Sequence, residues 1–305
     1  MRAPDMSLWH NRPLLPIKDL ATLLDGLRAN DPTLADGKLR LDSRVIGCES
    51  ADGDLYFDAD ARVDFSAVVA LTAALAATTV VQCLELYPLP HEYGLIAAEV
   101  LKVNTTIKSF DFCGQAFQYD KVAAALAGSL KVNRTLEVFN FHGGDHGELR
   151  EADARLFAEA IKANSTVSHV SFFSVDVGQS VATVLLDALK TNTGITSFML
   201  KGYLHIDFDS EAGREEYVQE ALEQVLKMNV TLKSCCVCGE QLRNAGLERN
   251  RGLPQLRQHL GWISTKSTGV GVQEAMRCPG IQATVFSFFL PPDAALPTSR
   301  TVGCE

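Results

Sequence analysis

Residues 141–148, FHGGDHGE, bring together side chains that could bind a metal ion. The segment holds two histidines and two carboxylates within eight residues. Imidazole nitrogens and carboxylate oxygens are common zinc ligands. The sequence shows no second group of ligands that would complete such a site, however. A glycine-rich loop would also hold its ligands in no fixed geometry. We therefore predict no metal site and no cofactor here.

The segment CCVC, residues 235–238, raises the question of a zinc or redox site. It contains three of the eight cysteines, which follow no regular spacing along the chain. If the segment is a strand, Cys235 points into the core and Cys236 points outward, so the thiols cannot converge on one ion. We expect them to pack as small hydrophobic residues. The start of the chain shows no secretory signal, which favours reduced thiols in a cytoplasmic protein, or in a host cytosol if the protein is delivered there.

Two acidic stretches, residues 49–65 and 207–216, could bind cations or a basic partner. Their carboxylates lack the Asp-x-Asp-x-Asp-Gly spacing of a calcium loop. They are either solvated acids near helix starts or an acidic rim for a partner, and the sequence leaves both open. The net charge of −9 disfavours nucleic acid or an anionic membrane as a partner.

Known catalytic motifs are missing from the sequence. It contains no phosphate-binding glycine loop with its lysine, no nucleophile elbow and no HExxH zinc motif. We therefore predict that the protein is not an enzyme. The longest aliphatic runs are alanine-rich and too short to span a bilayer, so we also predict no membrane partner.

Asn-x-Ser/Thr glycosylation signals occur at four places with similar surroundings. They begin at Asn104, Asn133, Asn164 and Asn229. A further copy of the surrounding pattern has Asn192 followed by Thr193 and Gly194, so the pattern survives where the signal is lost. We therefore expect these asparagines to serve a structural repeat rather than to carry glycans.

The repeat has about seven copies. Successive anchor positions are 30, 78, 104, 133, 164, 192 and 229, with Thr78 in place of asparagine at one of them. Most steps are 26 to 31 residues, and the longer steps of 48 and 37 contain the acidic stretches. A fixed period of this length is typical of a solenoid.

Each copy predicts a helix, a turn and a short strand. Apolar residues before the anchor have helical spacing, as in Val122, Leu126 and Leu130. We expect the anchor asparagine to end the helix in the left-handed conformation of a C-terminal cap. The apolar period then changes to two, as in Phe110 and Phe112, which predicts a strand with one buried face. Stacked copies would bury a continuous core between a parallel sheet and a layer of helices.

The unit ALxxNxTLxxLxL after an Ala- and Leu-rich helix resembles the ribonuclease-inhibitor-like class of leucine-rich-repeat proteins over residues 17–252. Residues 242–251, LRNAGLERNR, are similar to the terminal unit of tropomodulin-like and bacterial-effector members. The resemblance implies an α/β leucine-rich-repeat horseshoe with a parallel sheet on the concave face and helices on the convex face. Outside it we expect an N-terminal arm (1–16) and a C-terminal cap and tail (253–305).

The repeat register predicts which side chains line the concave face, because alternate strand residues share a face. The central row is Arg40, Glu85, Asp111, Asn140, Ser171, Met199 and Cys236. The adjacent row is Tyr87, Cys113, His142, Phe173, Lys201 and Cys238. Aromatic anchors beside charged groups are typical of protein-binding surfaces. We predict that these rows, the cysteines apart, bind the partner.

These features predict a monomeric, non-catalytic scaffold that binds another protein through the concave face and an acidic loop edge. A bacterial effector and a eukaryotic adaptor are both compatible contexts. The alternative is a regulator of a small GTPase, of the GTPase-activating type, that uses the repeat edge. Arg40 would be its first candidate residue, and this alternative rests on analogy of fold alone.

Overall fold

The computed structural model describes residues 13–15, 19–35, 37–42, 65–89, 91–114, 119–201, 211–237, 240–241 and 246–252. The chain divides into two compact units, residues 1–246 and 247–305. All elements named below belong to the first unit. Of the second, residues 247–252 are described, and they are helical. The expected C-terminal cap and tail, and most of the expected N-terminal arm, lie outside the described residues.

Helices and strands alternate along the first unit. The helices are α2 (Leu20–Ala29), the short 3-10 helix η1 (Pro32–Leu34), α4 (Phe65–Ala77), α5 (His91–Val103), α6 (Tyr119–Val132), α7 (Glu151–Ala163), α8 (Gln179–Leu189) and α9 (Glu211–Met228). The strands are β1 (Leu39–Leu41), β2 (Cys83–Leu89), β3 (Ser109–Gly114), β4 (Val138–Glu148), β5 (His169–Asp176), β6 (Ser197–Lys201), β7 (Ser234–Val237) and β8 (Glu240–Gln241).

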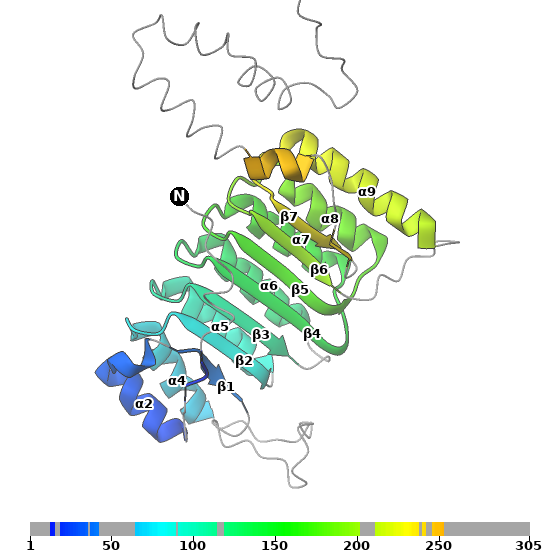
Figure 1. Cartoon of the computed structure of the whole chain (residues 1–305). Coiled ribbons are helices and arrows are strands. Elements are labelled where there is room, and N and C mark those ends of the chain that lie inside the picture. The colour runs from blue at the N-terminus through cyan, green and yellow to red at the C-terminus, as the bar shows by residue number, and fades with distance from the viewer. Residues whose placement is uncertain are drawn as a thin grey trace, which may run out of the picture. The chain divides into compact units, whose positions relative to one another are not determined.

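The strands form one sheet in sequential order, and the helices lie against one of its faces (Figure 1). Strands β1 to β7 are parallel, and each follows one of the predicted anchors. The predicted α/β solenoid is therefore confirmed. Strand β8, which the sequence did not predict, pairs antiparallel with β7 and covers part of the edge that β7 would otherwise expose.

The core lies between the sheet and the helices and is rich in phenylalanine. Phe112 stacks on Phe141 of the next strand with ring centroids 5.8 Å apart. Phe157 of α7 lies 5.5 Å from Phe141 and 5.2 Å from Phe172. All four side chains are fully buried. The phenylalanines that replace leucine in the repeat thus form a continuous aromatic column through the stacked units.

The anchor asparagines form a buried ladder, which we call the asparagine ladder: Asn104, Asn133, Asn164, Asn192 and Asn229. Asn164 is typical. Its Nδ2 donates to the carbonyls of Leu130 at 2.7 Å and Asn133 at 2.9 Å in the preceding unit. Its Oδ1 accepts from the backbone N–H groups of Thr166 and Val167, both at 2.9 Å. Each amide therefore closes its own turn and ties it to the unit before.

The left-handed cap predicted for these asparagines is wrong. The prediction is correct at the first anchor alone: Asn30 ends α2 in the left-handed region, with φ 50° and ψ 48°, and no other described non-glycine residue has a positive φ. Asn164 is extended, with φ −98° and ψ 128°. The position requires an amide that donates and accepts at once, not a residue that tolerates left-handed backbone. The ladder asparagines are 2–4% exposed, and their amides serve the structure of the repeat.

Replacing Gly194 with threonine, which would restore the repeat consensus, is expected to lower the free energy of unfolding. A Cβ at Gly194 would lie 2.7 Å from the backbone oxygen of Ser165, which cannot move aside as a side chain could. Overpacking of this kind costs about 1–3 kcal/mol. Urea unfolding of Gly194→Thr, with Gly128→Ala as control, measures the effect. Gly128 has open space around it, so an added methyl group there meets no other atom. A Gly194→Thr protein as stable as wild type would contradict the prediction.

Candidate functional site

The candidate site lies on the face of the sheet opposite the helices, here called the open face. Strand pairing places the predicted central row in line: Arg40 pairs with Glu85, Glu85 with Asp111, and Asp111 with Asn140. The line continues through Ser171, Met199 and Cys236. The register predicted from the repeat is therefore correct along this row.

The adjacent row, here called the outer row, is regular over β3 to β6. Cys113 pairs with His142, His142 with Phe173, and Phe173 with Lys201. At β2 the register shifts between Leu86 and Leu89, so the ladder does not continue evenly to Tyr87. Cys238 lies outside the described residues.

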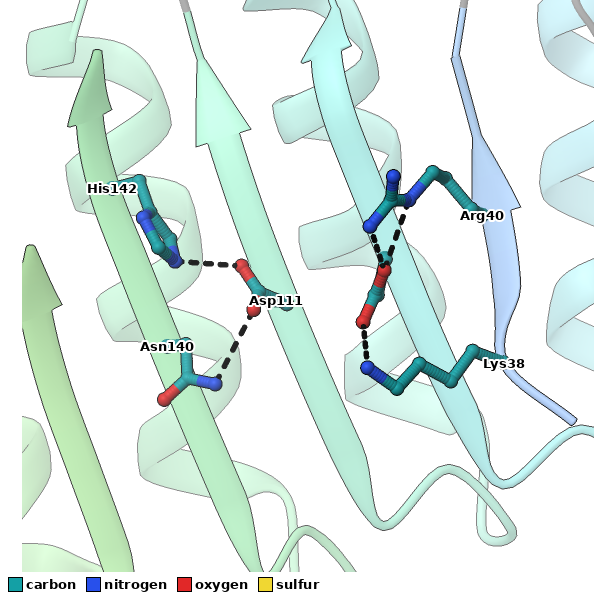
Figure 2. A network of polar contacts seen from close by, with 6 residues as sticks. Lys38, Arg40, Asp111, Asn140 and His142 are labelled. Atoms are coloured by element: carbon teal, nitrogen blue, oxygen red, sulfur yellow. Dashed lines mark hydrogen bonds and ion pairs between the residues drawn. The ribbon is translucent and has the colours of Figure 1, made fainter. Parts of the chain in front are cut away.

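Glu85 is the centre of the first polar cluster (Figure 2). Its Oε2 accepts from Arg40 Nε at 3.1 Å and Arg40 Nη2 at 2.9 Å, and its Oε1 pairs with Lys38 Nζ at 2.9 Å. The Arg40 guanidinium also lies 5.2 Å from the ring centroid of Tyr87. These contacts hold the Tyr87 ring beside a fixed positive charge.

Lys38 was not among the predicted site residues. It stands two positions before Arg40, and alternation along a strand places both on the same face. That spacing was the available signal. The spacing could not predict the ion pair of Lys38 with Glu85, because Glu85 belongs to the neighbouring strand β2.

Asp111 is the centre of the second cluster (Figure 2). Its Oδ1 lies 3.0 Å from His142 Nε2, and its Oδ2 accepts from Asn140 Nδ2 at 3.3 Å. The imidazole of His142 stacks on Phe173, with ring centroids 4.6 Å apart and planes 21° apart. Asp111 therefore fixes the imidazole that covers one face of Phe173, and both rings are preorganised.

Asn140 leaves one hydrogen-bonding group unused. Its Oδ1 is buried and accepts no hydrogen bond, and the residue is 1% exposed. A buried acceptor without a donor costs about 1–3 kcal/mol, and such groups are uncommon in folded proteins. Asn140 lies in the middle of the open face. Natural proteins often tolerate such a local loss of stability at functional sites.

The predicted site residues differ in how much surface they offer. Glu85, Asn140 and Ser171 of the central row are buried, whereas Tyr87 of the outer row is 47% exposed. Lys201 is also exposed, and the side chains of His142 and Asp111 keep 27% and 24% of their surface. The most exposed side chains of the open face are therefore Tyr87 and Lys201, at the two ends of the outer row, while Arg40 of the central row keeps 37% of its side-chain surface.

Cys235 packs in the core, as predicted, and Cys236 on the open face is buried as well, at 7% exposure. Cys235 is completely buried, and desolvation, together with the neighbouring Cys236, raises the pKa of its thiol to about 12. A thiol in this state is neither a nucleophile nor a ready metal ligand. Within the described part of the chain, no three His, Cys, Asp or Glu side chains are arranged to hold a metal ion.

The FHGGDHGE segment is not the loop that the sequence predicted. Residues 141–148 continue β4, and Gly147 and Glu148 pair with Val175 and Asp176 of β5 after a register shift. The side chains of residues 143–148 are not among those described, so the metal prediction is not tested there.

The acidic stretches also lie largely outside the described residues. The first stretch lies between β1 and α4, as predicted. The second follows β6, as predicted, but does not stop before the next helix: its residues 211–216 form the first turns of α9. Arg40, the residue that the GTPase alternative needs, already donates to Glu85. None of the helices described here is long and apolar enough to cross a membrane.

Comparisons with known proteins add little to this geometry. No protein-family model matches the chain, and no curated protein matches it. Among solved structures, the chain is similar to one titled Leiomodin-1 Actin-Binding Site 2, with 17% identity and a TM-score of 0.37 over 77% of this chain and 95% of that one. It is also similar to the tropomodulin C-terminal domain of Caenorhabditis elegans, with 12% identity and a TM-score of 0.31 over 68% and 93%. At these values neither likeness carries an argument, and the fold rests on the chain's own strands, helices and register.

Proposed function

We propose that the protein is a non-catalytic scaffold that binds a partner protein through the outer row of the open face. The observation that carries the proposal is the pair of fixed, accessible aromatic groups on this row, Tyr87 beside Arg40 and Phe173 beneath His142. Rings held in place before binding lose little side-chain freedom when a partner covers them. Aromatic anchors of this kind are enriched among the residues that dominate binding energy.

The charges around these rings indicate the chemistry of the partner surface. Arg40 is ion-paired with Glu85, which it shares with Lys38, and Asp111 is paired with His142, so each ring has a polar neighbour that is already paired. Lys201 at the far end of the row is exposed, and no ion pair of its side chain is seen in the described part of the chain. A polypeptide segment with apolar side chains for the two rings and a carboxylate for Lys201 fits this layout.

Three further parts of the proposal rest on the sequence. We propose that the chain is a leucine-rich-repeat protein of the ribonuclease-inhibitor-like class, because each of the parallel strands β1 to β7 is joined to the next through an α-helix. We also propose that it acts as a monomer in the cytoplasm or in a host cytosol. The acidic insertions remain candidates for a second contact with the partner. Among the described residues, no observation favours the GTPase alternative.

Replacing Tyr87 and Phe173 together with alanine is expected to weaken partner capture by at least about tenfold, because two anchors are lost. The affinity is measured by immobilising the full chain, identifying captured proteins by mass spectrometry and titrating the strongest one. The double variant should unfold at nearly the wild-type urea concentration, since Tyr87 is exposed and neither ring belongs to the core.

The matched control is Val103→Ala with Val132→Ala. These residues are 62% and 54% exposed and end α5 and α6, away from the open face. The control removes exposed apolar surface without touching the outer row and should bind the partner as wild type does. Equal capture by wild type and by the Tyr87/Phe173 variant would reject the proposed binding surface.

A further inference from the structure

The two edges of the sheet offer little backbone to a partner strand. At β1, the Lys38 N–H donates to the carbonyl of Pro13 at 2.9 Å, and the Leu15 N–H donates to the carbonyl of Lys38 at 3.0 Å. At β7, Cys236 and Val237 pair antiparallel with the two-residue strand β8. A partner strand could lengthen the sheet only by displacing these short segments or by pairing with them. A partner segment that lies across the strands on the open face needs no such rearrangement.

The charged side chains at the centre of the open face are already engaged with one another. Both carboxylate oxygens of Glu85 are paired with cations. Both oxygens of Asp111 are paired as well, one with His142 and one with Asn140. An extended segment across this face would bury backbone N–H and C=O groups against them, at a cost of about 1–3 kcal/mol for each group left unpaired. An α-helix bonds these groups internally, so it can cover the face without that cost.

The spacing of the strands also matches a helix. Neighbouring strands lie about 4.8 Å apart and a helix rises about 5.4 Å per turn, so a helix laid across the strands advances nearly one turn per strand. Over the four intervals from β2 to β6 the mismatch grows to about 2.4 Å. An extended segment places side chains on one face about every 6.6 Å, and its mismatch over the same intervals is about 7 Å. A helix can therefore present one side chain to each strand of the outer row.

We infer that the partner protein binds through an amphipathic α-helix that lies across the strands along the outer row, which rests on the function proposed above. One apolar side chain of the helix contacts Phe173, a second contacts Tyr87 three turns away, and an acidic side chain one turn beyond the first reaches Lys201. Lys201 is exposed, and none of the ion pairs seen in the described part of the chain involves it, whereas Arg40 is paired with Glu85. The C-terminal end of the helix, with its partial negative charge, lies at Lys201.

Photo-crosslinking from two positions tests the helix. In the full chain, photoreactive p-benzoylphenylalanine replaces Tyr87 or Phe173 singly, which keeps an aromatic ring at the position. The probe is the purified protein that the immobilised chain captures most strongly, and mass spectrometry identifies the residue crosslinked from each position. The two positions are about 14 Å apart, which spans about ten residues of a helix and about four of an extended segment. We expect crosslinks about ten residues apart in one helix, with the Phe173 crosslink nearer its C-terminus.

Charge exchange tests the acidic contact. Lys201→Glu is expected to weaken binding of the same protein by about tenfold, because an attraction becomes a repulsion. Replacing the acid that lies one turn beyond the Phe173 crosslink with lysine should restore most of the affinity. The matched control is Lys131→Glu, an exposed lysine in the last turn of α6, which should bind as wild type does.

The outcomes distinguish the helix from the binding surface itself. If no protein is captured, or if capture ignores loss of the Tyr87 and Phe173 rings, the proposed surface is rejected and the helix with it. If capture depends on these rings but the crosslinks are spaced as on an extended segment, or fall in separate segments, the surface stands and the helix is overturned. A reversed order of the two crosslinks, or a Lys201→Glu loss that no exchange of a partner acid restores, would contradict the assigned direction and the acidic contact.

Discussion

Asn164→Ala is expected to lower the free energy of unfolding by about 3–5 kcal/mol, a large effect for one substitution. The alanine leaves the carbonyls of Leu130 and Asn133 without their donor and the N–H groups of Thr166 and Val167 without their acceptor. These groups surround a side chain that is 3% exposed, so water cannot replace the lost bonds at the same geometry. The substitution also removes the tie between two neighbouring units, on which the stability of a solenoid depends.

Asn30 offers a matched control for Asn164. It occupies the first anchor, where it is exposed and its Oδ1 accepts from the Thr79 N–H at 2.8 Å and the Thr78 hydroxyl at 3.3 Å. Asn30→Ala should lower the free energy of unfolding by only about 1 kcal/mol. It loses hydrogen bonds that water can replace, and it puts alanine in a left-handed backbone conformation. Urea midpoints and m-values for both variants measure the difference. An Asn164→Ala protein no less stable than the Asn30→Ala protein would show that the ladder does not support the fold.

The sequence was sufficient for the repeat, the alternation of helix and strand, and the register of the central row. The reason is physical: side-chain alternation has a period of two, and the anchor asparagine sets its phase in every unit. The spacing from each anchor is therefore enough to align Arg40, Glu85 and Asp111. The sequence could not determine how these side chains pair, because a pairing depends on rotamers and on neighbouring strands.

Two expectations had to be revised or extended, for different reasons. The left-handed cap was inferred from the residue type. At Asn164 the side-chain amide matters instead, because it donates one hydrogen bond to a backbone carbonyl and accepts another from a backbone N–H. The burial of Val138 was not foreseen, because alternation identifies the face of a residue and not what covers that face. The accessible site is consequently narrower than the predicted one, because Glu85, Asn140 and Ser171 are buried.

Phe157→Ala is expected to lower the free energy of unfolding by about 3–5 kcal/mol, through a cavity rather than through lost hydrogen bonds. Phe157 is completely buried, and its ring reaches from α7 to Phe139, Phe141 and Phe172, with centroids 5.8, 5.5 and 5.2 Å away. It is the one ring of this group contributed by a helix, so it joins the helix layer to strands β4 and β5.

The size of the effect should follow the volume removed. Phe157→Leu keeps most of the volume and should cost less than about 1.5 kcal/mol. Because an apolar cavity of this kind stays dry and can accept a small aromatic molecule, benzene should raise the urea midpoint of Phe157→Ala and leave that of wild type unchanged. Partner capture by the folded Phe157→Ala protein should equal that of wild type, since the outer row is on the opposite face of the sheet. Equal stability of the alanine and leucine variants would mean that the aromatic column relaxes around the gap, and that Phe157 does not hold the layers together.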